Sequence, residues 1–100
     1  MSEAATLIVR YYIDPETALP HLYRHDVSES EAEEVLEHPD EDRLGAEGTR
    51  VALGQTFGGR VLRVIYVPDP VPNSVFVITA YELRGNALLA YRRRHRKKQR

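Results

Sequence analysis

The chain of 100 residues contains no cysteine and no tryptophan, and it has only one methionine. The absence of cysteine excludes disulfide bonds, thiol catalysis and thiolate metal sites. No apolar run approaches the roughly 18 residues that a membrane-spanning helix needs, and residues 1–13 lack the basic start and long apolar core of a secretory signal. We therefore expect a soluble, cytoplasmic, prokaryotic protein that uses histidine, carboxylate, tyrosine, hydroxyl and arginine chemistry.

Carboxylates are absent from the end of the chain, although the protein as a whole is almost neutral. The formal net charge is −1, with 14 Lys and Arg against 15 Asp and Glu. Seven of the basic residues lie within 92–100, whereas every carboxylate lies at or before Glu82. Residues 1–91 therefore carry a net charge of −8, from seven basic and fifteen acidic groups, and residues 92–100 carry +7. Such blocks of like charge stay solvated and favour a partner of opposite sign.

A chain of this length forms one domain, which we place at 1–91, followed by a basic tail over 92–100. Lysine and arginine bind phosphates by releasing counterions, so this tail is a candidate nucleic-acid contact. The residues concerned are Arg92, Arg93, Arg94, Arg96, Lys97 and Lys98. Two alternatives remain: the tail folds against an acidic partner protein, or it is a passive solvating end.

The first part of the chain predicts a strand followed by an irregular element. Residues 6–13 are rich in β-branched and aromatic side chains and stop at Asp14, which favours a strand. A short helical segment is expected over 15–24. Pro20 would remove a hydrogen bond inside it, so a kinked or irregular form is predicted.

The clearest helix signal follows at Ser28. Ser28 and Glu31 have the spacing of a capping box, and Pro39 stops the pattern, which predicts a helix from Glu29 to about His38. Its apolar stripe is narrow and the rest is mostly glutamate, which is typical of a surface helix lying on a sheet. The acidic segment 39–49 is expected to be a loop.

Three further strands are predicted over 50–56, 61–67 and 75–83, separated by a Gly-Gly turn and by a proline-rich loop. Consecutive strands of this kind pair antiparallel. The run 61–67 is apolar except for Arg63, which indicates a central strand covered on both faces. We therefore expect an α+β fold with an antiparallel sheet of about four strands and two or three helices packed on it.

The end of the chain is predicted to cover the second face of this sheet. Leu88, Tyr91 and His95 recur at helical spacing, and Asn86 is a candidate N-cap, so a helix is expected over about 86–96. The Gly-Asn pair before it leaves a fifth strand after a hairpin turn as the alternative.

Three segments resemble a known family in their order and spacing. They are DPETALPHLYRHDVSESEA, RVALGQTFGGRVLRVIY and VFVITAYEL, and the resemblance spans most of residues 6–91. They resemble the BrnT-type toxins, and still more a related family of short bacterial proteins of unknown function. The most specific part is the hairpin that contains Gly54-x-Thr56 and then Gly59-Arg60-x-Leu62-x-Val64-x-Tyr66. The resemblance implies the RelE-like toxin fold, cleavage of RNA, and a cognate antitoxin protein.

The match to the toxin pattern is partial at the basic residues. His25, preceded by Arg24, matches a Lys-His pair, and Arg50 matches an arginine at the start of the second strand. Two basic residues of the pattern are replaced here, by Thr17 and Tyr81. The alternative function is therefore a catalytically silent module that binds RNA or a protein.

Metal-independent cleavage of RNA uses the ribose 2′-hydroxyl as nucleophile and needs a base, an acid and cations around the phosphate. His25 is the candidate base, because histidine is the side chain that titrates near neutrality. Arg50 and Arg63 are candidates for binding the phosphate, and Tyr81 for donating a proton or stacking on a base. A structural alternative for Arg63 is an ion pair with a buried carboxylate such as Glu82.

No cofactor, metal site or small-molecule ligand is expected. His21 and His25 stand four residues apart and would supply two metal ligands, but the sequence shows no third. The predicted partners are therefore RNA and an antitoxin protein.

We predict that deletion of residues 92–100 weakens RNA binding and flattens its dependence on salt, because fewer counterions are released from phosphates. The measurement is the slope of log Kd against log salt concentration for a single-stranded RNA, compared between the full and the shortened chain. An unchanged slope would show that the basic end is passive.

Overall fold

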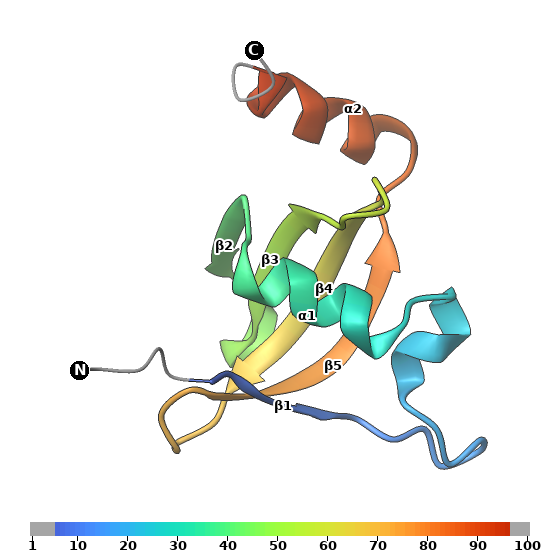
Figure 1. Ribbon diagram of the computed structural model, residues 1–100, viewed down its shortest axis with the longest axis vertical. Coiled ribbons are helices and arrows are strands. Elements are labelled where there is room, and N and C mark those ends of the chain that lie inside the picture. The colour runs from blue at the N-terminus through green and yellow to red at the C-terminus, as the bar shows by residue number, and fades with distance from the viewer. Residues whose placement is uncertain (1–5, 97–100) are drawn as a thin grey trace.

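In the computed structural model, which describes residues 6–96, the chain folds into one five-stranded sheet and two α-helices (Figure 1). The strands are β1 (Ile8–Tyr11), β2 (Glu41–Leu44), β3 (Arg50–Gln55), β4 (Val61–Pro68) and β5 (Ser74–Glu82). The helices are α1 (Glu29–Glu37) and α2 (Gly85–Arg94), with short 3₁₀ helices η1 (His21–His25) and η2 (Ala46–Gly48) in the connections. Among these described residues, no helix has the length and apolar character that crossing a membrane demands.

The sheet is mixed, with the strand order β1-β5-β4-β3-β2. The three strands predicted after residue 49 are confirmed as β3, β4 and β5, and they pair antiparallel in succession. β1 instead pairs parallel to β5, with Val9 opposite Val75. The expectation of a wholly antiparallel sheet is therefore wrong. No hairpin joins β1 to a neighbour, because the chain after β1 crosses the sheet through η1 and α1 to the far edge.

The acidic segment 39–49, expected to be a loop, contains the additional strand β2. It pairs antiparallel with β3, and Glu41 lies opposite Leu53. Its sequence Glu-Asp-Arg-Leu has low strand propensity, but an edge strand tolerates charged side chains and takes its backbone hydrogen bonds from the neighbouring strand. Tertiary pairing thus overrides local preference and gives five strands instead of about four.

The predicted surface helix is confirmed as α1, together with its capping box. The Ser28 hydroxyl accepts from the Glu31 N–H, while the Glu31 carboxylate accepts from the Ser28 N–H. Ala32 and Val35 are fully buried and lie in the main core with strand residues such as Val64. α1 thus covers one face of the sheet, as Figure 1 shows.

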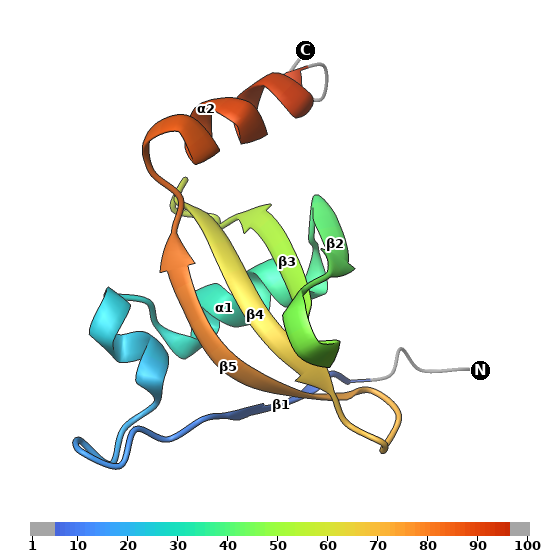
Figure 2. The same ribbon diagram turned by 180° about the vertical axis from the view of Figure 1, so that it is seen from behind.

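The opposite face of the sheet is covered only at one end. Tyr91 of α2 packs there with Leu53, Val61 and Leu83 in a second, smaller core. Figure 2 shows β3, β4 and β5 from this side, with α2 beyond their end and no other described helix in front of them. The expectation that the end of the chain covers the second face is met only at this end. The uncovered part, here named the open face, carries Val51, Arg63, Ile65, Val67, Thr79 and Tyr81.

The helix expected near the end of the chain is confirmed as α2, so the alternative of a fifth strand at this place is wrong. α2 begins at Gly85, and Arg84 rather than Asn86 occupies the N-cap position. The boundary predicted after residue 91 falls within the helix, which continues to Arg94. The first part of the basic segment therefore belongs to the folded domain.

Gly54 lies where α1 packs closely on β3. A Cβ atom at this position would lie 3.2 Å from Val35 Cγ1 and 3.5 Å from the His38 carbonyl oxygen. We predict that Gly54→Val lowers the free energy of unfolding by about 1–3 kcal/mol, because the added methyl groups push the helix away. Gly58→Val, where a Cβ would meet only Thr56 Oγ1 at 3.8 Å, is expected to cost much less. Urea denaturation measures both variants, and equal losses would contradict the close helix contact.

Candidate functional site

Arg63 is the charged residue in the middle of β4, and it lies on the open face. Its neighbours Leu62 and Val64 are fully buried in the core beneath α1, so the alternation of side chains places Arg63 on the other side. Within residues 6–96 no carboxylate pairs with Arg63, and its Nε is buried without a hydrogen-bond partner. A buried polar group without a partner is costly, and the positive charge of this guanidinium would be offset by an anionic ligand on the open face.

Three of the four predicted catalytic residues lie side by side at this place. The Arg63 guanidinium lies over the ring of Tyr81, its cross-strand neighbour on β5, with Cζ 5.9 Å from the ring centroid. The Tyr81 ring in turn lies 5.8 Å from the His25 ring, centroid to centroid. Arg63, Tyr81 and His25 are named the open-face row below.

His25 reaches the row from η1, which packs against β5 beside the sheet (Figure 2). Leu22 of the same short helix is 1% exposed and belongs to the main core, so it fixes η1 to the sheet. The His25 side chain is exposed. The row therefore runs from a half-buried guanidinium to an imidazole that solvent and ligands can reach.

Arg50 does not join the row, because it lies on the face that α1 covers. Leu53 of β3 pairs with Arg63 and shares its face of the sheet. Arg50 lies three residues before Leu53, an odd number, so the alternation of side chains places Arg50 on the other face. There the Arg50 Nε donates to Asp42 Oδ1 at 3.1 Å, and the Tyr66 hydroxyl donates to the other oxygen of the same carboxylate. Arg50 and Arg63 therefore cannot bind one phosphate together.

Glu82 is excluded as the partner of Arg63, contrary to the structural alternative considered for that residue. Glu82 lies opposite Leu62 and so shares the face of the main core. Its carboxylate accepts from the Arg60 Nε at 3.3 Å and lies 3.5 Å from the Arg84 guanidinium. The guanidinium of Arg63 is thus left available to a ligand.

Part of the basic charge of α2 anchors the helix to β2. The Arg94 Nε donates to Glu41 Oε2 at 2.6 Å, and the His95 Nε2 lies 2.7 Å from the same oxygen. The Tyr91 hydroxyl donates to the carboxylate of Asp40, just before β2. Arg94 is therefore engaged within the domain.

The other predicted nucleic-acid contacts are exposed or lie beyond the described residues. Arg92, Arg93 and Arg96 are exposed on or just after α2, at the end of the sheet. Lys97 and Lys98 lie outside residues 6–96. The described part of the basic segment therefore presents three exposed arginines, beside the engaged Arg94, on and just after the helix at the end of the sheet.

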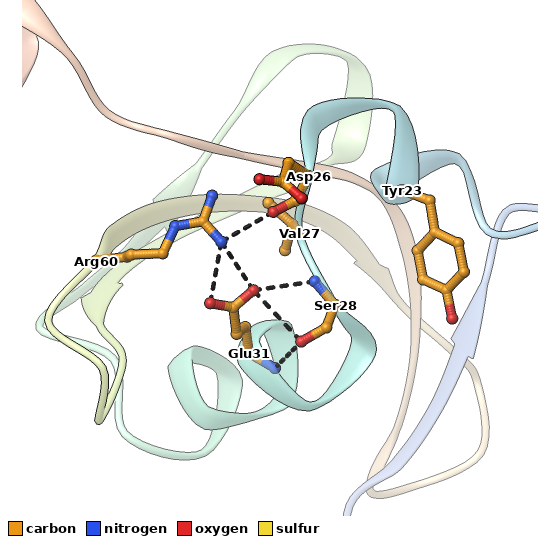
Figure 3. A pocket seen from close by; sticks show the side chains of 6 residues that line it. All are labelled: Tyr23, Asp26, Val27, Ser28, Glu31 and Arg60. Atoms are coloured by element: carbon orange, nitrogen blue, oxygen red, sulfur yellow. Dashed lines mark hydrogen bonds and ion pairs between the residues drawn. The ribbon is translucent and has the colours of Figure 1, made fainter.

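A polar hollow of about 300 Å³ at the start of α1 is a separate feature (Figure 3). It is lined by Tyr23, Asp26, Val27, Ser28, Glu31 and Arg60. The Arg60 Nη1 donates to both carboxylate oxygens of Glu31, at 2.9 and 3.0 Å, and to the Asp26 carbonyl at 2.9 Å. Because these charged groups bind one another, the arrangement fastens α1 to the start of β4 rather than forming a ligand site.

Two polar groups near the row were not predicted from the sequence as site residues. Thr79 Oγ1 is buried without a partner and lies on the open face, two residues before Tyr81. Asp14 is buried and accepts from His21 and Arg24. The alternation of side chains along β5 would have indicated Thr79. Nothing local in the sequence indicates the contact between Asp14 and His21.

Comparison of the chain with models of protein families, with curated proteins and with solved structures gave no match. Within residues 6–96, no group of three or more histidine, aspartate or glutamate side chains is placed to hold a metal ion. The functional interpretation therefore depends on the chemistry of the open-face row.

The ion pair between Arg60 and Glu31 predicts a change in stability with pH. Burial acts to raise the pKa of Glu31, but the hydrogen bond from the Ser28 N–H and the bonds from Arg60 outweigh it, so this pKa lies below its usual value. A carboxyl group with a lowered pKa stabilises the fold above its unfolded pKa, and this contribution is lost as pH falls through the folded pKa.

We predict that Arg60→Gln lowers the free energy of unfolding at pH 7 by about 1–3 kcal/mol, because it leaves a charged group without its partner. The variant should also show a shallower loss of stability than the wild type below about pH 5. Urea denaturation across this range measures both effects. Arg92→Gln, at an exposed position on α2, serves as the charge-matched control, and the same pH dependence in the two variants would count against the fastening role.

Proposed function

We propose that the open face binds single-stranded RNA and that the open-face row cleaves it without a metal ion, as a toxin-like endoribonuclease. The observation that carries this proposal is the continuous contact from the unpaired Arg63 through Tyr81 to His25. A guanidinium, an aromatic ring and an imidazole are groups that cleavage through the 2′-hydroxyl uses.

Each member of the row has a role that follows from its surroundings. Arg63 binds the phosphate through two parallel hydrogen bonds from its guanidinium, which no carboxylate of the described residues engages. Tyr81 offers a ring face to an unpaired base, and such faces are available in single-stranded RNA but hidden in a duplex. His25, at the exposed end, removes the proton of the 2′-hydroxyl as general base.

The exposed arginines of the last helix support RNA as the ligand. Arg92 and Arg93 are exposed on α2 and Arg96 is exposed just after it, and Figure 2 shows α2 beyond the end of the strands. Their contacts to phosphates would be independent of base sequence and sensitive to salt. They would hold the strand while the row acts on one of its phosphates.

The resemblance to the BrnT-type toxins adds a protein partner and a RelE-like architecture to the proposal. A helix layer on one face and an open second face suit that architecture. A cognate antitoxin would prevent cleavage by covering the open face and would carry acidic groups to match the exposed arginines of α2. A short reading frame next to the gene is the expected source of this partner.

A second candidate function is a module that binds RNA or a protein without cleaving it. The observation that favours it is the position of Arg50, which pairs with Asp42 on the covered face. The row is left with Arg63 as its single arginine. One cation offsets less of the charge that develops on the phosphate in the transition state than two would.

We predict that the pure protein cleaves a labelled single-stranded oligoribonucleotide in the presence of EDTA. Arg63→Gln and His25→Asn should each lower kcat/KM by about 100-fold or more, because they remove the phosphate ligand and the base. Arg50→Gln removes one positive charge from the covered face and is the matched control. Its kcat/KM is expected to stay near the wild-type value.

Expression of the wild-type chain without a partner gene should arrest growth, and Arg63→Gln and His25→Asn should relieve the arrest. Binding of the oligoribonucleotide without any cleavage, measured by fluorescence anisotropy, would leave only the binding module. Equal losses of activity in Arg50→Gln and Arg63→Gln would contradict the placement of the site on the open face.

A further inference from the structure

We infer that His21 is the second proton-transfer group of this site, the acid that protonates the leaving 5′-oxygen, and that the buried carboxylate of Asp14 holds it in place. The inference rests on the proposed cleavage of RNA, since it assigns a role within that reaction. It goes beyond the open-face row, which supplies a base and a cation but no dedicated acid.

Cleavage through the 2′-hydroxyl needs two proton transfers at the same phosphate. The O2′–H proton passes to a base while the bond from O2′ to phosphorus forms. The bond from phosphorus to O5′ then breaks while O5′ takes a proton from an acid. The products are a 2′,3′-cyclic phosphate and a free 5′-hydroxyl. The base begins neutral and the acid begins protonated, so His25 needs a neighbour that can donate.

The ring of His21 lies next to the ring of His25, close enough for both rings to reach the same phosphate. The two ring centroids are 5.7 Å apart and the ring planes meet at 70°. Nitrogens on two such rings can each reach one oxygen of a single phosphate through hydrogen bonds of roughly 2.6–3.2 Å. Both rings are accessible, since the side chain of His21 is 32% exposed and that of His25 is also exposed.

The buried carboxylate of Asp14 orients the ring of His21. Asp14 is 4% exposed, and its Oδ2 lies 3.3 Å from the His21 Nδ1. A carboxylate at Nδ1 sets the orientation of an imidazole and leaves Nε2 as the nitrogen that exchanges a proton with a ligand. Hydrogen bonds from Arg24 and from the Glu16 N–H lower the pKa of Asp14 to about 2, so the carboxylate is charged at neutral pH.

The contacts of His21 favour the role of acid. Its ring faces the Asp14 carboxylate, the Tyr12 ring at 6.0 Å and the His25 ring. The Arg24 Nε donates to the same oxygen of Asp14 and so helps to hold the carboxylate in place. The ring is thus fixed at its Nδ1 side, and its Nε2 side is left to donate a proton to a ligand.

The surroundings of His25 favour the role of base. Its described ring contacts are His21 and Tyr81, and beyond Tyr81 lies the guanidinium of Arg63. No carboxylate of residues 6–96 contacts the His25 ring in the way that Asp14 contacts His21. His25 is thus the histidine in contact with the open-face row, and its ring lies on the side of the site where Arg63 would bind the phosphate, which suits it to accept the proton of the 2′-hydroxyl.

A surface hollow of about 290 Å³ next to His21 gives room for the leaving nucleoside. It is lined by Tyr12, Asp14, Pro15, Glu16, His21 and Arg24. The phosphate would thus lie across the outer edges of the two adjoining histidine rings, with the base side on the open face and the leaving side toward this hollow.

The test uses two substrates that differ in their need for an acid. One is a single-stranded oligoribonucleotide, and the other is uridine 3′-(4-nitrophenyl phosphate), whose phenolate leaves without a proton. His21→Asn should lower kcat/KM on the oligoribonucleotide by about 100-fold or more and remove the alkaline limb of its pH profile. It should leave the nitrophenyl ester near the wild-type rate, whereas His25→Asn should slow both substrates.

His21→Asn keeps an N–H donor for the Asp14 carboxylate. If thermal melting shows that this variant does not fold, His21→Gln is tested in its place. His38→Asn, an exposed histidine at the end of α1, controls for the loss of one imidazole. Equal effects of His21→Asn on both substrates, or an unchanged pH profile, would overturn the inference while leaving the proposed cleavage intact. A wild-type protein inert toward both substrates would overturn the proposed function, and this inference with it.

Discussion

The site depends on the one-sided cover of the sheet. α1 buries Ala32 and Val35 against the sheet, and β4 meets this layer with Leu62 and Val64. Because side chains alternate along a strand, the same packing sends Arg63 to the side that α2 covers only at one end. A slip of one residue in β4 would bury the guanidinium under α1 and expose two core residues. The register that builds the core therefore also builds the site.

The uneven distribution of charge along the sequence is partly balanced in three dimensions. Three successive carboxylates before and within β2 each hold a group from another element. Asp40 accepts from Tyr91, Glu41 from Arg94, and Asp42 from Arg50. The first two carboxylates thus position α2, and the third holds Arg50 on the covered face. Positive charge remains at the surface on the arginines of α2 that this acidic segment does not reach.

Local signals in the sequence predicted most of the elements but few of the contacts between them. The capping box of Ser28 and the turn at Gly58-Gly59 act over a few residues, and α1 and the hairpin of β3 and β4 form as expected. The parallel pairing of β1 and the pairing of β2 arise from the path of the chain across the sheet, which no short pattern records.

In the site, the hairpin centred on the Gly-Gly turn pairs Arg63 with Leu53. Leu53 is three residues from Arg50 on the same strand, and an odd separation means opposite faces. The placement of the two arginines on opposite faces was therefore accessible from the sequence by counting outward from the turn. The contacts of His25 with Tyr81 and of His21 with Asp14 depend on how η1 packs on β5. No pattern in the sequence indicates how this short helix packs, so these contacts could not be predicted from the sequence.

The pairing of the first strand with the last has a consequence for biosynthesis. Val9 lies opposite Val75, and Arg10 bonds to Asp69 across 59 residues of sequence. Contacts of such long range form late in folding. On the ribosome β1 emerges first but finds its neighbour only after β5 has been made, and β5 also brings Tyr81. A nascent chain therefore has neither the complete sheet nor the open-face row, and any activity that depends on this row, the proposed one included, begins only when translation is nearly complete.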